Sequence, residues 1–344
     1  EWYKLATEFG FGVREHFSTF SINGLDENLE ESLNLAQQHM LSPKISDETW
    51  NETKGIILSE RDDEQKDPRA LSNALAHFHR YGSESRYLKR PSDADLNAST
   101  VASLSKTLLE AFEVKRTILY YGPRSAEEIT TTIQNGFLGK KPTKDTPTFI
   151  PNRSLSPEAN QVFFLQKEMA QAQVRLEFAA GTYDESKAPL GQLYNEYFGG
   201  GMAGLVFQEL REARALAYSA WAHFFTPSRP QDENILVGAI GCQADKTIEA
   251  VNAFIELLDE MPINQTRWDS AHAAILSAYR TNPISSRSIP GFVYDFNALA
   301  LNEDPRSNRY DSLQKAEIDS LRGFYEKEIQ PKSILVSIVG DSIK

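Results

Sequence analysis

Apolar residues at helical spacing fill most of the first half of the chain. One stripe runs from Leu25 to Met40, and Asp26 and Glu27 near its start suit the positive end of a helix dipole. Helices are predicted over residues 25–40, 46–58, 71–81, 101–112 and 125–133. Residues 13–22 alternate imperfectly and residues 117–121 are uniformly apolar, so both runs predict strands.

The second half follows a segment of different composition. Residues 139–159 are rich in Lys, Pro, Thr and Ser, which is typical of a linker. Beyond it, the pattern predicts strands over residues 162–165, 173–179, 218–225, 235–240 and 334–339. Helices are predicted over residues 245–261, 268–279, 290–301 and 315–329.

Residues 194–219 contain two short amphipathic helical patterns joined by Gly199, Gly200 and Gly201. Glycine adopts backbone angles that other residues avoid, so the chain can turn sharply here and let another backbone approach closely. Two interpretations stay open, a tight structural corner and a loop that faces a substrate.

An internal repeat organises the chain. WNETKGIILS at Trp50 matches WDSAHAAILS at Trp268, an offset of 218 residues that also brings Gly122 onto Gly340. We read two copies of one domain. The predicted fold is α+β, with tandem homologous domains at residues 1–138 and 160–344, each an antiparallel or mixed sheet with helices packed on it. Residue 1 corresponds to position 219, so the first copy is expected to lack its N-terminal strands and a helix.

Composition narrows the class of protein. A chain of 344 residues favours about two domains. The net charge of −12 argues against a nucleic-acid partner or an anionic membrane surface, and no apolar run is long enough to span a bilayer. The single cysteine, Cys242, excludes an intramolecular disulfide and a Cys-rich zinc site.

The histidines do not have the spacing of a catalytic metal site. A zinc hydrolase needs two His one helical turn apart and a carboxylate, in the patterns HxxEH or HExxH, and neither pattern occurs. The six histidines are His16, His39, His77, His79, His223 and His272. His77 and His79 are two residues apart, which places them on different helix faces. We therefore expect no metal site and no complete catalytic centre in this chain.

Arg211 and Tyr218 are the remaining candidates for chemistry. A guanidinium can hold a peptide carbonyl or carboxylate, and a phenol can donate to an oxyanion, so the pair suits the binding of a peptide backbone. The spacing alone is also explained without a functional role, by an Arg that faces solvent and a Tyr that is half buried.

The segment NEYFGGGMAGLVFQELREARALAYS, residues 195–219, resembles the C-terminal half of M16 metallopeptidases (pitrilysin-like, inverted zincins), especially the large bacterial members with four domains. Residues 1–138 resemble the third domain after its first helix, and residues 160–344 resemble a complete fourth. The resemblance implies zinc bound by HxxEH and a distant Glu in the N-terminal half, with none in this chain. It also implies a substrate-binding role for Arg211 and Tyr218, beside the three glycines.

Glu60 lies where the metal-bearing domain of this family places its third zinc ligand. The Asn-Ala-x-Thr segment common before that ligand is absent from GVREHFSTFSINGL, residues 12–25. We therefore interpret Glu60 as an exposed carboxylate near a helix end.

The resemblance leads to a functional hypothesis: this chain is the non-metal half of a zinc metalloendopeptidase, inactive alone, and it forms the substrate-chamber wall. Its partner would be an N-terminal HxxEH half, in the same polypeptide or in a separate subunit, and a dimer is left open. The resemblance implies bacterial cytoplasm or periplasm and favours the periplasm. The alternative is an inactive structural or binding homologue, like the non-catalytic chain of processing peptidase or a bc1 core subunit.

Overall fold

The computed structural model describes residues 1–14, 17–330 and 333–342, and the chain forms two compact units. Unit 1 comprises Glu1–Arg61 and Pro91–Ile150, and unit 2 comprises Asp62–Arg90 and Pro151–Lys344. Asp62–Arg90, which the repeat places in the first domain, thus lies with the second unit, because its helix packs on that unit's sheet. The predicted domain boundaries at residues 138 and 160 come from the sequence repeat. A division into compact units does not test a repeat, so these boundaries stay a prediction.

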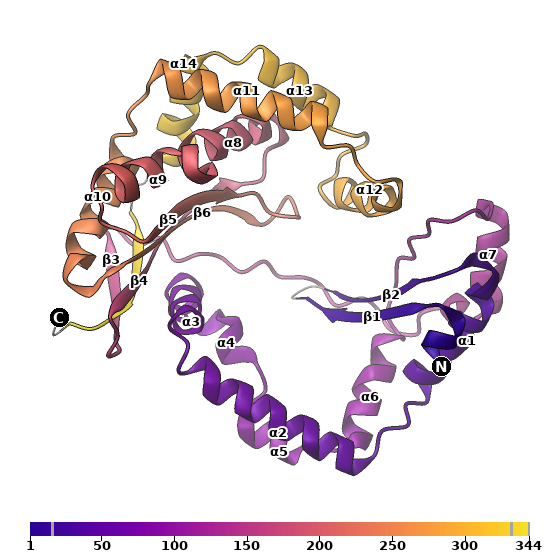
Figure 1. Cartoon of the computed structure of the whole chain (residues 1–344). Helices are drawn as coiled ribbons and strands as arrows, with labels where there is room; N and C mark the ends of the chain where they lie inside the picture. Colours follow the sequence, from indigo (N-terminus) through magenta and orange to yellow (C-terminus); the bar gives the residue numbers. More distant parts are fainter. Residues whose placement is uncertain (15–16, 331–332, 343–344) are drawn as a thin grey trace. The chain divides into compact units, whose positions relative to one another are not determined.

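Unit 1 is a β-hairpin with helices around a small aromatic core (Figure 1). β1 (Glu8–Val13) pairs antiparallel with β2 (Ser18–Asn23). The helices are η1 (Trp2–Leu5), η2 (Asp26–Asn28), α1 (Leu29–Leu41), α2 (Asp47–Glu64), α5 (Asp93–Ala98), α6 (Val101–Ala111), α7 (Ala126–Asn135) and η4 (Phe137–Gly139), of which α2 continues into unit 2. Ala36, Phe137 and Leu138 are buried, and Phe9 and Phe20 pack against them.

In unit 1 one strand prediction is correct only in part and one is wrong. Of the strand predicted over residues 13–22, residues 18–22 lie in β2 and Val13 ends β1, and residues 15 and 16 lie outside the described residues. The remainder of β1 was missed because Gly10 and Gly12 break the alternation that predicts a strand. Residues 117–121 form no strand, and Leu119 is 50% exposed. A buried strand requires a neighbour to bond its backbone, and among the described residues of unit 1 only β1 and β2 pair.

Unit 2 contains a mixed five-stranded sheet, so the α+β prediction is confirmed. Its strand order is β3 (Gln161–Gln166), β7 (Leu335–Gly340), β4 (Gln171–Thr182), β6 (Glu233–Gln243) and β5 (Ser219–Phe225). β3 runs parallel to β7, and the other pairs are antiparallel. Alternation along β4 places Val174, Leu176 and Phe178 in the core, as the sequence predicts.

Helices cover this sheet unequally. Figure 1 shows α8, α9 and α11 on one side of the sheet and α3 on the other. The first side carries the core, with the fully buried side chains Tyr194, Tyr197, Phe198 and Phe254. The helices of unit 2 are α3 (Pro68–Tyr81), η3 (Gly82–Glu84), α4 (Arg86–Lys89), η5 (Glu185–Lys187), α8 (Ala188–Tyr194), η6 (Asn195–Gly199), η7 (Gly201–Ala203), α9 (Leu205–Phe207), η8 (Gln208–Ala213), η9 (Ala244–Lys246), α10 (Thr247–Asp259), α11 (Gln265–Thr281), η10 (Ser286–Ser288), α12 (Ile289–Ala298), α13 (Arg306–Gln314), α14 (Ile318–Phe324) and η11 (Tyr325–Ile329). Within the described ranges, none of the chain's helices is long and apolar enough to cross a membrane.

Element lengths recur at the offset of 218 residues. η2 and α1 return as η9 and α10 with the same lengths. The residues Gly82 and Ala300, which follow α3 and α12, both have positive φ, 56° and 59°. The environments of these two helices differ. α3 buries Ser72, Ala76 and His79, whereas no residue of α12 is buried.

Candidate functional site

The glycine-rich corner is built from short helical pieces that pack against strand β5. The π-helical turn η6 continues α8, and after Gly200 the chain passes through η7 and α9 into the π-helical turn η8. The side chain of Asn195 holds this corner to the strand, because its Nδ2 donates to Phe224 O at 2.9 Å and its Oδ1 accepts from Phe224 N at 2.7 Å. The two predicted short helices around the glycines are thus present, partly as π turns.

Each of the three glycines is required by the corner itself. A Cβ at Gly199 would lie 1.9 Å from Ala222 O, and one at Gly200 would lie 2.2 Å from Glu196 O. Gly201 has open space around it but a φ of +58°, a conformation that L-residues with side chains rarely adopt. The structural interpretation therefore accounts for all three, and their substrate role stays a prediction.

Arg211 and Tyr218 are accessible but have different partners. Arg211 lies on η8 with its side chain 45% exposed, its Cζ 4.7 Å from the Phe207 ring centroid and its Nε 3.7 Å from Glu212 Oε1. Tyr218 precedes β5, is 52% exposed, and its hydroxyl accepts a hydrogen bond from Gln243 Nε2 at 3.0 Å. Both side chains can therefore reach a ligand, and their roles stay predictions.

The histidines occupy separate environments. Among the described residues no group of three or more His, Cys, Asp or Glu could hold a metal ion, and His16 lies outside those residues. His79 Nδ1 is 3.0 Å from Ser337 Oγ, whereas His77 Nδ1 is 3.1 Å from Ser85 Oγ. Burial, and then the positive charges of Arg86 and Arg80, lower the pKa of His77 to about 4. Glu60 is exposed on α2, in the position expected for a solvated carboxylate.

A charged cluster on the open side of the unit 2 sheet was not predicted. Arg175 lies opposite Ala239 on β6, which lies opposite Trp221 on β5, and the Arg175 Cζ is 5.2 Å from the Trp221 ring centroid. Alternation along 173–179 assigns Arg175 to the polar face of its strand. Its pairing with a residue of a distant strand has no local signal in the sequence.

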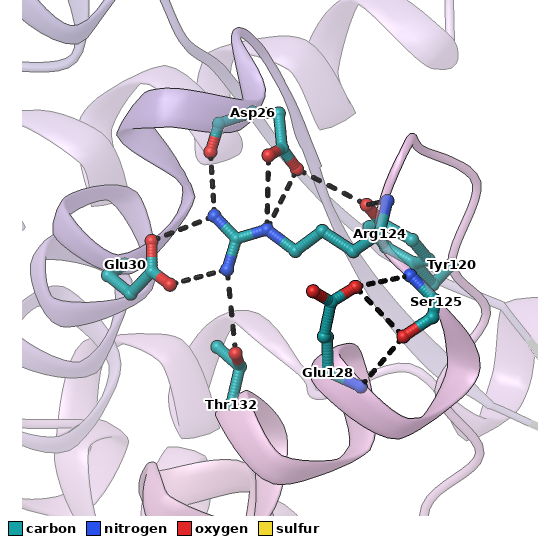
Figure 2. Close-up of polar contacts among 7 residues, drawn as sticks. All are labelled: Asp26, Glu30, Tyr120, Arg124, Ser125, Glu128 and Thr132. Carbon is teal, nitrogen blue, oxygen red and sulfur yellow. Dashed lines mark hydrogen bonds and ion pairs between the residues drawn. The ribbon is translucent and has the colours of Figure 1, made fainter.

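A second polar network, in unit 1, is centred on Arg124 (Figure 2). Its Nε donates to Asp26 Oδ1 at 3.0 Å, its Nη2 donates to Glu30 Oε2 at 3.0 Å, and Tyr120 Oη also donates to Asp26. The hydrogen bond from Arg124 lowers the pKa of Glu30. The Arg124 and Tyr120 donors are hydrogen-bonded to the Asp26 and Glu30 carboxylates. The network therefore connects the start of α7 to η2 and α1, and we interpret it as structural.

One segment of the chain, which includes the glycine-rich corner, matches a known family model. Residues 116–275 match the family model of the peptidase M16 inactive domain. This segment, slightly less than half of the chain, is similar to the peptidase M16 inactive domain. The matched segment includes Gly199–Gly201, Arg211 and Tyr218, so the resemblance that those residues carry is confirmed.

Solved structures share the fold at low sequence identity. A peptidase M16 inactive domain from Pseudomonas fluorescens is 16% identical with a TM-score of 0.79, over 99% of this chain and 82% of that one. The periplasmic protease PqqL from Escherichia coli is 14% identical with a TM-score of 0.72, over 99% of this chain and 38% of PqqL. The ferredoxin protease FusC, solved with Arabidopsis ferredoxin, is 15% identical with a TM-score of 0.77, over 99% and 37%. No curated protein sequence matches the chain.

Proposed function

We propose that this chain is the non-metal half of an M16 zinc metalloendopeptidase and that it binds peptide as one wall of the substrate chamber. The observation that carries the proposal is the match of residues 116–275 to the inactive domain of M16 peptidases. Zinc and its HxxEH ligands would belong to the N-terminal half, where the metal would activate a water molecule for peptide hydrolysis. This chain would position the substrate and would not hydrolyse it alone.

Arg211 and Tyr218 are the proposed peptide contacts. Both are about half exposed, and each follows the glycine-rich corner within the matched segment. The Arg211 guanidinium has donors that can hold a substrate carbonyl, and the Tyr218 hydroxyl can donate to a developing oxyanion. Stacking on Phe207 orients the Arg211 guanidinium, and its contact with Glu212 at 3.7 Å is an exposed ion pair, which is weak.

Helix α12 exposes an apolar face, unlike its counterpart in the proposed repeat. Ile289 and Val293 are 49% and 50% exposed on this helix. In the proposed repeat, α12 is the counterpart of α3, whose buried side packs on strands β7 and β4 of a sheet. The exposed apolar side of α12 is therefore available to a partner. PqqL is a periplasmic protease, and by this likeness we also propose a periplasmic location.

Reconstitution tests the proposal. Purified chain is mixed with a separately expressed N-terminal half that carries HxxEH, and cleavage of a quenched fluorescent peptide is measured. We expect cleavage only in the mixture, with kcat/KM lowered about 10- to 100-fold by Arg211→Ala or Tyr218→Phe and an unchanged melting temperature. Arg280→Ala, on the exposed side of α11, is the matched control and should leave kcat/KM unchanged.

Two results would contradict this function. Unchanged kcat/KM in both variants would remove the substrate role of Arg211 and Tyr218. A stable complex of the two halves without cleavage, in the presence of zinc, would assign the chain to the structural and binding homologues of the same fold instead.

A further inference from the structure

The side of the unit 2 sheet opposite the core is only partly covered. Helix α3 packs on β7 and β4 there. Strand β5 at the sheet edge directs the residues Ser219, Trp221, His223 and Phe225 to this side, and all four are exposed. Trp221 and Phe225 are 38% and 47% exposed, so aromatic surface remains accessible beside α3.

Arg175 lies in this open region and is held from two sides. Its neighbour across the strand pair is Ala239, whose small side chain lets the guanidinium extend over β6 to Trp221. The Arg175 Cζ is 5.2 Å from the Trp221 ring centroid, and Nη2 donates to Asn73 Oδ1 at 2.7 Å. Stacking and one hydrogen bond fix the plane of the guanidinium while leaving other donors of the group for a ligand.

The charges around Arg175 do not balance. Glu177, its nearest acidic neighbour along β4, is 5% exposed and accepts from Arg80 Nε at 2.9 Å and Nη2 at 2.5 Å. Among the described residues no carboxylate lies within ion-pair distance of Arg175. Burial and then the charge of Arg80 lower the pKa of Arg175, although the group stays protonated at neutral pH. Two cations and one anion therefore share a half-buried region in a chain whose net charge is −12.

We propose that Arg175 and Trp221 form a carboxylate-binding subsite for a peptide, with the acid group paired to the Arg175 guanidinium and an adjacent apolar side chain packed on Trp221 and Phe225. The proposal rests on the proposed peptide-binding function. A fixed guanidinium binds a carboxylate through two parallel hydrogen bonds, which suits either an acidic side chain or the C-terminal carboxylate of a peptide. The local positive charge also attracts an anionic segment that the chain as a whole would repel.

Calorimetry with defined peptides separates the two carboxylate sources. The probes are acetyl-Ala-Phe-Glu-Phe-Ala-amide, the same peptide with Gln in place of Glu, and the Gln peptide with a free C-terminus. We expect at least one of the two acids to bind about tenfold more tightly than the neutral amide, and the identity of that acid names the source. Raising NaCl from about 0.05 to about 0.5 M should reduce the difference, because salt screens the ion pair.

Variants assign the difference to the site. Arg175→Gln should make the acidic and neutral peptides bind equally, and Arg175→Lys should retain only part of the preference because an ammonium lacks the planar fork. Trp221→Leu should weaken all three peptides. The matched control is Arg280→Gln, since the Arg280 Cζ lies 5.6 Å from the Tyr310 ring in a similar stack away from this region.

Three outcomes would overturn the subsite: no binding of any peptide, equal binding of acidic and neutral peptides, or a preference that survives in a correctly folded Arg175→Gln variant. The folded state of each variant is checked by circular dichroism and by its melting temperature. The proposed function is judged separately, by cleavage in the reconstituted mixture, so its failure and the failure of the subsite are distinguishable.

Discussion

Arg80 donates through Nε to Glu177 Oε2 at 2.9 Å, and this ion pair joins helix α3 to strand β4 in the middle of the unit 2 sheet. Nearby, His79 stacks on Phe163 with ring centroids 3.8 Å apart and contacts Ser337 Oγ at 3.0 Å. Helix α3 is therefore fixed by buried polar contacts in addition to its apolar stripe. Helix α3 therefore cannot shift along the sheet without breaking these contacts, because each polar group has one particular partner.

Removal of one partner of the Arg80–Glu177 pair should be strongly destabilising. The side chains are 15% and 6% exposed, so either single Ala variant leaves a largely buried charge without its partner. We expect Arg80→Ala or Glu177→Ala to lower the free energy of unfolding by about 3–5 kcal/mol, measured by urea denaturation. The double variant Arg80→Met/Glu177→Met should recover most of that loss. A double variant no more stable than the singles would contradict the ion-pair explanation.

His77 should make the stability of unit 2 depend on pH. Its pKa is about 4 in the folded chain and near 6.5 when unfolded, so between these values the unfolded state binds more protons. The stabilisation is complete above pH 6.5 and is lost as the pH falls through 4. Because the side chain is only half buried, we expect about 1–2 kcal/mol.

NMR titration of the His77 ring measures the midpoint directly, and urea denaturation at pH 7 and pH 4 measures the loss. His77→Gln should show a smaller difference between the two pH values than the wild type. A ring that titrates near 6.5 in the folded protein would refute the burial effect.

The contribution of the Arg124 network to the stability of unit 1 should decrease at acidic pH. Arg124 lowers the pKa of Glu30, so its contribution is present above the ordinary pKa of a glutamate and is lost as the pH falls through the lower, folded value. Arg124→Met should lower the melting temperature of unit 1 by a few degrees at pH 7 and by less at pH 3. Lys144→Met, which removes an exposed pair with Glu113, is the control and should have little effect at either pH. Equal losses at both pH values would mean that the carboxylates are not involved.

Local pattern predicted many of the elements but none of their distant partners. The alternation of residues 173–179 correctly separates Val174 from Arg175, because the two faces of a strand differ by one position. Helix α3 is likewise visible in its own periodicity. The contact between His79 and Ser337, however, joins positions 258 residues apart. No local rule specifies such a pairing.

The same limit explains the candidate site. Arg211 and Tyr218 were found because a contiguous segment resembles a known family. Arg175 and Trp221 are brought together only by the register of three strands, through Ala239, and neither residue is unusual in its own segment. Residues 117–121 show the converse, an apolar run that predicts a strand but has no neighbouring strand to bond among the described residues.

Replacing Gly199 with alanine should show whether the corner requires glycine because there is no room for a side chain. A Cβ at Gly199 would lie 1.9 Å from Ala222 O, so Gly199→Ala must move the corner away from β5. We expect a loss of at least about 2 kcal/mol in the free energy of unfolding. Gly323→Ala in α14 is the matched control, because nothing lies within 4 Å of its new Cβ and alanine favours a helix by up to about 1 kcal/mol.

The displacement should also reach the peptide contacts, since the chain continues from the corner through η7 and α9 into η8, which carries Arg211. In the reconstituted mixture, Gly199→Ala should therefore lower kcat/KM even under conditions where the variant is fully folded, whereas Gly323→Ala should not. If both variants have wild-type stability, the close approach of Gly199 to β5 is not a constraint on the fold. If Gly199→Ala is destabilised but retains full kcat/KM when folded, the corner supports the domain without positioning Arg211.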